Sequence, residues 1–217
     1  MTFTASSWLV SMGDLSRVVL LLTGLLGLLR FAELPRGLRY LVGLAWFGLL
    51  METASIFMHG HVSNLWLIPF DSAGELWLLS LVYAWALGSA RFARWRPWWV
   101  GAFVLYAGLS SLVVPRARFS TGVLVLESLL LLLLAGLYFR KLLNELQVPR
   151  LDRDPMFWVS TGLLQFSLGK LLIALFGNYM LEHYSLALNQ WVWALHALLI
   201  TVLYLCYFRA LWMRPQK

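Results

Sequence analysis

The chain has 217 residues, of which 61% are hydrophobic and only 12% are charged, and its mean hydropathy is +0.76. A soluble domain of this size cannot bury so much apolar surface, so we expect lipid to solvate the chain. The net charge of +7 would suit nucleic acid in a soluble protein, but here the Arg residues lie in short segments between apolar runs and fit anionic lipid headgroups. Composition therefore excludes a soluble nucleic-acid-binding protein and predicts an all-α membrane protein.

Seven apolar segments can cross the membrane as helices, since about 20 apolar residues span a hydrocarbon layer about 30 Å thick. We predict one seven-transmembrane helix bundle over 1–217, with helices at 10–31, 39–59, 66–88, 98–114, 120–143, 156–178 and 189–211. The first has the shortest apolar run, bounded by Arg17 and Arg30, and can span only if it extends at both ends. Asp14 and Arg17 are spaced to pair on one helical face.

Lys and Arg are distributed unevenly between the two sides of such a bundle. With alternate connections assigned to opposite sides, one side receives Arg30, Arg36, Arg39, Arg91, Arg94, Arg96, Arg140, Lys141, Arg150, Arg153, Arg209, Arg214 and Lys217. The other side receives Arg17, Arg116 and Arg118. Because short basic loops stay in the cytoplasm, we expect the N-terminus outside and the C-terminus in the cytoplasm of a multi-pass protein of the inner (plasma) membrane. The N-terminal segment lacks the features of a signal peptide, so we expect the mature chain to keep it.

Ionisable side chains inside the predicted spans are costly in hydrocarbon, so they face the bundle interior or a water-filled cavity. They are Glu52, Asp71, Glu75, Glu127, Lys170 and His196. Given the direction of each helix, all of them fall in the outer half of the bundle. We predict a polar ligand or ion cavity open to the outside and roofed by Asn64 and Asn178. The alternative is that these groups only join helices through hydrogen bonds.

Lys170 is the basic residue that belongs to neither side, because it lies within the sixth predicted span. An unpaired ammonium at this depth is expensive, so Lys170 should pair with Glu127, Glu75 or Glu52, or lose its proton. A lysine inside a seven-helix bundle also suggests a retinal Schiff base. Retinal proteins carry that lysine on the last helix, however, and the seventh helix here has none.

Histidines form a second group on the outer side: His59, His61, His183 and His196. Zinc or copper needs three or four imidazole, thiolate or carboxylate ligands close together, and His59, His61 and His183 are the candidate metal ligands. The alternatives are pH sensing by histidine protonation and plain interfacial histidines. The sequence names no cofactor.

Catalytic motifs are missing. The chain has no HExxH, no GxSxG, no Gly-rich phosphate loop and no HxxxH in the last predicted helix, so we assign no catalytic residue. Acid–base chemistry on a lipid by the carboxylates and Lys170 keeps a membrane-embedded enzyme as an alternative.

Two stretches resemble a known group of proteins. They are Asn64-Leu-Trp-Leu followed by Glu75, and Asp154-Pro-Met-Phe-Trp-Val-Ser-Thr-Gly-Leu-Leu-Gln-Phe166, whose Asp154-Pro155 start also predicts a helix N-terminus. Both are similar to uncharacterised bacterial seven-helix membrane proteins that are encoded beside, or fused to, sensor histidine kinases. The resemblance implies a sensory input module without catalytic output of its own. Since the chain ends at Lys217, any output domain is expected on another polypeptide.

These features predict a receptor-like membrane sensor. A ligand, ion or proton in the outer cavity biases helix packing, and the basic loops pass the change to a cytoplasmic signalling partner such as a histidine kinase. Membrane lipids are the other expected partner, and a homo-oligomer is allowed. A small-solute or proton-coupled transporter subunit is the second hypothesis.

Overall fold

The computed structural model describes residues 5–58, 67–113, 120–145, 151–183 and 186–213. These residues form seven α-helices and one short 3₁₀ helix, and they contain no strand. The elements are α1 (Ala5–Leu29), α2 (Arg36–Met58), α3 (Ile68–Leu87), α4 (Ala90–Val113), α5 (Thr121–Glu145), η2 (Leu151–Arg153), α6 (Pro155–His183) and α7 (Leu186–Trp212). The predicted all-α class is confirmed for this part of the chain.

Four helices among the described residues are long and apolar enough to cross a membrane. They comprise Arg36–Met58 in α2, Thr121–Asn144 in α5, Pro155–Phe176 in α6 and Trp191–Trp212 in α7. Large apolar side chains on these helices are exposed, among them Leu50, Leu133 and Leu172. Apolar surface of this extent is typical of a face that contacts lipid, so the fold agrees with a membrane protein.

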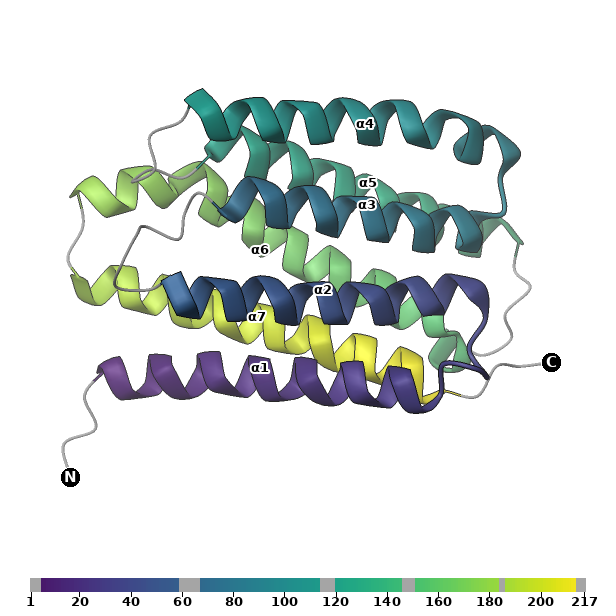
Figure 1. The fold of residues 1–217 in the computed structure, drawn as a ribbon, viewed down its shortest axis with the longest axis horizontal. Coiled ribbons are helices and arrows are strands. Elements are labelled where there is room, and N and C mark those ends of the chain that lie inside the picture. The colour runs from purple at the N-terminus through teal and green to yellow at the C-terminus, as the bar shows by residue number, and fades with distance from the viewer. Residues whose placement is uncertain (1–4, 59–66, 114–119, 146–150, 184–185, 214–217) are drawn as a thin grey trace.

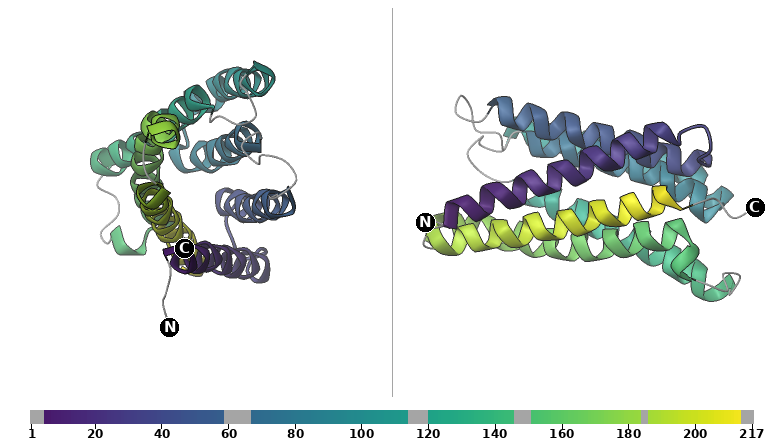
Figure 2. Two further views of the ribbon diagram at one scale, coloured as in Figure 1. Left: turned by 90° about the vertical axis from the view of Figure 1, so that its left-hand side faces the viewer. Right: turned by 90° about the horizontal axis from the view of Figure 1, so that it is seen from below.

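The helices alternate in direction (Figure 1), and six of them form a closed ring of contacts. Within it α1 packs on α2, α2 on α3, α3 on α5, α5 on α6, α6 on α7 and α7 on α1. The remaining helix, α4, packs on α3, touches α5 and lies at one edge of the bundle (Figure 2). The starts of α1, α3, α5 and α7 therefore share one end of the bundle with the last turns of α2, α4 and α6. We call this the α3-start end.

The predicted start of the fourth helix is wrong. α4 begins at Ala90 rather than at 98, and it continues through Pro97. Its first turns carry Arg91, Arg94 and Arg96, which interrupt the apolar segment and so make it look as if the helix begins later. A helix can extend beyond its apolar segment where its polar turns find partners. Here Arg96 donates a hydrogen bond to the Ser80 hydroxyl (3.2 Å) and lies over the Trp77 ring of α3. These contacts hold the charged turns of α4 against α3.

The predicted start of α6 is correct and has a local cause. Pro155 is the first helical residue, and the Asp154 carboxylate accepts hydrogen bonds from the backbone N–H groups of Met156 (3.2 Å) and Phe157 (3.1 Å). A carboxylate at this position satisfies backbone donors that lack a partner within the helix. Asp154 also accepts a hydrogen bond from the Tyr138 hydroxyl of α5, which joins the cap to the neighbouring helix.

Basic side chains at the end opposite the α3-start end cap the last turns of helices. Lys141 donates hydrogen bonds to the carbonyl oxygens of the last two residues of α3, at 2.8 and 3.2 Å. Arg30 does the same for the last two residues of α7, with 3.0 Å to Leu211. Such carbonyls have no partner within their own helix, and positive charge is favourable near them. Part of the basic excess at this end therefore stabilises the fold.

The packing of α1 on α2 can be tested at Gly27, because this residue of α1 lies in close contact with Val42 of α2. A Cβ at Gly27 would lie 2.6 Å from Val42 Cγ2, whereas a Cβ at Gly43 would have nothing within 4 Å. We expect Gly27→Ala to push α1 from α2 and to lower the free energy of unfolding by about 1–3 kcal/mol. Gly43→Ala should leave it unchanged or raise it by up to about 1 kcal/mol, because Ala is the better helix former. Thermal unfolding in lipid nanodiscs checks both, and equal Tm values for the two variants would contradict the close contact.

Candidate functional site

Lys170 of α6 is buried between two carboxylates that come from other helices. Its Nζ lies 3.0 Å from Oε2 of Glu75 on α3 and 2.9 Å from Oε2 of Glu127 on α5, and it donates a hydrogen bond to Glu75. The Glu127 side chain is 0% exposed and that of Lys170 is 11% exposed. We call these three residues the ion-pair cluster. The pairing of Lys170 with Glu75 and Glu127 agrees with the prediction.

The ion-pair cluster ties three helices together. A buried ion that loses its partner costs several kcal/mol, so α3, α5 and α6 cannot shift independently without a loss of stability. The ring of Phe166, one turn before Lys170 on α6, lies 5.5 Å from Nζ and adds a cation–π contact. The cluster contains one more carboxylate than ammonium, so one of its carboxylates needs a proton or a further cation to be neutralised.

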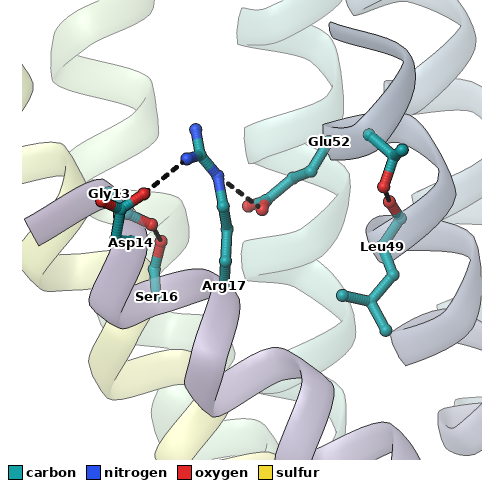
Figure 3. A network of polar contacts seen from close by, with 7 residues as sticks. Gly13, Asp14, Ser16, Arg17, Leu49 and Glu52 are labelled. Atoms are coloured by element: carbon teal, nitrogen blue, oxygen red, sulfur yellow. Dashed lines mark hydrogen bonds and ion pairs between the residues drawn. The ribbon is translucent and has the colours of Figure 1, made fainter. Parts of the chain in front are cut away.

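Glu52, the third predicted partner of Lys170, instead pairs with Arg17 of α1 (Figure 3). Arg17 Nε lies 3.4 Å from Glu52 Oε2, and Arg17 Nη1 lies 2.8 Å from Asp14 Oδ1. The predicted Asp14–Arg17 pair is confirmed, whereas the link from Arg17 to α2 was missed. The side chains of Arg17 and Glu52 are 44% and 27% exposed, and a pair so accessible contributes at most about 1 kcal/mol.

A cavity of about 550 Å³ lies inside the ring of six helices. Its lining comes from α1, α2, α3, α5, α6 and α7, and α4 contributes none of it. Of the predicted site residues, those in contact with this space are Glu52, Asp71, Glu75, Lys170 and His196. Glu127 does not line this space but contacts Lys170, which does. The structure thus brings together side chains from five helices that the sequence placed at a similar depth.

The lining changes from polar to apolar along the helix axes. On α2 it passes from Ser55 and Glu52 to Gly48, Ala45 and Leu44, and on α7 from Trp193 and His196 to Ile200, Leu203, Tyr204 and Tyr207. We call these two parts the charged end and the apolar end. The charged end lies toward the α3-start end, since Asp71 is in the first turn of α3. At about 1.5 Å per residue, His196 and Tyr207 are separated by about 16 Å along α7.

His196 lines the charged end without joining an ion pair with a described residue. Its ring centroid is 5.6 Å from that of Phe166 and 5.8 Å from that of Trp193. Its Nδ1 is buried and has no hydrogen-bond partner among the described residues. Trp193 and His196, three residues apart on α7, both line the cavity.

The other predicted site residues fall outside the described part of the chain. These are Asn64, His59 and His61, and likewise the side chains of Asn178 and His183. The roof of the cavity and the histidine metal site therefore stay predictions. Within residues whose side chains are described, no group of three or more His, Cys, Asp or Glu residues is arranged to hold a metal ion.

The charges around the cavity suit a positively charged guest. The described carboxylates are Glu52, Asp71, Glu75 and Glu127, and the cations near them are Arg17 and Lys170. In a medium of low dielectric constant, excess carboxylate needs a proton or a bound cation. Comparison of the chain with protein families, with curated proteins and with solved structures gives no match. Function is therefore inferred from the cavity and its charges.

Removal of the ammonium tests the ion-pair cluster. Lys170→Met leaves two carboxylates without their cation, and we expect a loss of about 3–5 kcal/mol in the free energy of unfolding. The triple variant Lys170→Met/Glu75→Gln/Glu127→Gln removes the uncompensated charge, so its Tm should exceed that of Lys170→Met.

Both variants are compared by thermal unfolding in nanodiscs at neutral pH. The matched control is Glu33→Gln, whose carboxylate is 68% exposed at the opposite end of the bundle and whose loss should not change Tm. A triple variant that unfolds at or below the Tm of Lys170→Met would argue against mutual neutralisation of the three side chains.

Proposed function

We propose that this protein is a receptor-like sensor of the plasma membrane that crosses the bilayer seven times, with its N-terminus outside. The cavity receives a small ligand or ion from the outside, and its occupancy is passed to a signalling partner in the cytoplasm. The observation that carries the proposal is the ion-pair cluster beside the cavity, because it joins α3, α5 and α6 through charges that a guest alters.

The coupling follows from charge balance. A cation bound at the charged end attracts the Glu75 carboxylate and repels the Lys170 ammonium, so the arrangement of α6 relative to α3 and α5 differs between the empty and occupied cavity. The ligand shifts this equilibrium only by its difference in affinity for the two arrangements. The far end of α5 and the neighbouring η2 carry exposed basic residues such as Arg140 and Arg153, which suit contact with an acidic surface of a partner such as a histidine kinase. The resemblance to proteins associated with such kinases supports this partner.

A proton-coupled transporter is the second candidate, and the excess of carboxylates in the cavity favours it. Transporters, however, commonly bind their substrates between paired broken helices. Each α-helix among the described residues runs without a break. We therefore favour the sensor.

Flux and gene regulation distinguish the two candidates. If the protein is a sensor, we expect deletion of its gene and the Glu75→Gln substitution to change the same set of transcripts in the native host, with the variant present at the wild-type protein level. We also expect no uptake of protons or amines into proteoliposomes beyond protein-free vesicles. Flux that depends on Glu75, together with an unchanged transcript set, would support the transporter and reject the sensor.

The seven-span topology is tested with single cysteines in a Cys206→Ser background. We expect a membrane-impermeant maleimide to label Arg116→Cys in intact cells, and Ser89→Cys only after the membrane is opened, because positively charged connections stay in the cytoplasm. Ser89 lies between α3 and α4 and is exposed. Labelling of Ser89→Cys in intact cells would contradict the proposed orientation.

A further inference from the structure

Asp71 is the cavity carboxylate that belongs neither to the ion-pair cluster nor to the Arg17–Glu52 pair. Lys170 is held by Glu75 and Glu127, and Glu52 is held by Arg17. Asp71 lines the charged end and has no ion pair with a described residue. A positively charged group bound there would neutralise Asp71 without displacing an existing cation. An anionic guest would instead lie against Asp71 and Glu52.

The apolar end of the cavity contains a buried hydroxyl without a partner. Tyr207 is 2% exposed, lines the cavity, and its hydroxyl has no hydrogen-bond partner among the described residues. Leu44, Leu203 and Ile200 surround the same space. The apolar lining favours a guest with an apolar body. Because an unsatisfied buried hydroxyl is costly, a guest that also forms a hydrogen bond with the Tyr207 hydroxyl is favoured further.

Both ends belong to one elongated cavity. His196 and Tyr207 are three helical turns apart on the same face of α7. A volume of about 550 Å³ lies within the usual range of small-molecule sites. A metal ion or a single proton would occupy only the charged end.

We propose that the guest is an amphipathic cation. Its ammonium or similar head lies at Asp71, and its apolar body extends between α2 and α7 toward Tyr207, whose hydroxyl can bond to a polar atom at the far tip of the guest. This inference rests on the proposed function, in which the cavity is the ligand site, and it names the class of ligand. Aromatic rings near the head, such as that of Trp193, add cation–π attraction.

The test titrates ethyl-, butyl-, octyl- and decylammonium into the full-length protein in phosphatidylcholine nanodiscs, with intrinsic fluorescence and Tm as readouts. Each added methylene should tighten binding by about fourfold until the apolar end is full. Partition into lipid also rises with chain length, so every value is compared with empty nanodiscs and with the variants. Octyl sulfate and octanol have the same chain without the positive charge, and they should bind at least about tenfold more weakly.

Two kinds of variant test separately how the protein binds the charged head and the apolar body of the ligand. Asp71→Asn should weaken octylammonium and ethylammonium alike, by at least about tenfold, whereas the matched Asp152→Asn at the opposite end should change neither. Ala45→Phe, or Ile200→Trp if the first does not fold, fills the apolar end. Either should remove the gain with chain length and leave ethylammonium binding unchanged.

Several results would overturn the inference. If ethylammonium binds as tightly as octylammonium and both depend on Asp71, the ligand is a small cation, and the sensor proposal stands without an amphipathic ligand. Equal binding of octyl sulfate and octylammonium, or equal binding by wild type and Asp71→Asn, would show that the head is not recognised as proposed. Failure of the sensor itself would appear separately, as an unchanged transcript set in the Glu75→Gln strain.

Discussion

Charge inside an apolar bundle must be neutralised, and this requirement organises the centre of the molecule. Lys170 meets Glu75 and Glu127 from two other helices, with N–O distances of 3.0 and 2.9 Å. The cost of an uncompensated buried ion fixes the relative positions of α3, α5 and α6. Because one ammonium faces two carboxylates, the second carboxylate needs a proton or a further cation beside the cavity. Stability and the capacity to bind a cation therefore have one physical origin.

The two ends of the bundle use charge differently. At the α3-start end, carboxylates and Lys170 gather around a cavity of about 550 Å³. At the other end, Arg30 and Lys141 cap the carbonyl groups of α7 and α3, so positive charge stabilises helix ends without entering the interior. This division explains how a strongly apolar chain keeps a net charge of +7 while its cavity is acidic. It also separates a proposed ligand-binding end from a proposed signalling end.

Helical periodicity and charge predicted much of this arrangement from the sequence. The all-α class, the start of α6 at Pro155 and the expectation that Lys170 pairs with Glu127, Glu75 or Glu52 needed only spacing, helix direction and the cost of buried charge. The order of the ring could not be predicted, because the contact of α3 with α5, and not only with α4, depends on packing between distant segments. For the same reason the Arg17–Glu52 pair and the apolar end near Tyr207 were missed. The fourth helix was placed too late because Arg91 to Arg96 interrupt its apolar run without breaking its backbone.

An experimental structure of the protein in lipid nanodiscs, at a resolution that defines side chains, tests this explanation most directly. We expect the Lys170 ammonium within about 4 Å of the carboxylates of both Glu75 and Glu127, the distance that defines an ion pair, with Asp71 facing the same cavity. If Lys170 points to lipid, or if the carboxylates of Glu75 and Glu127 lie far from it and from each other, the proposed ligand site is wrong, whatever the number of spans.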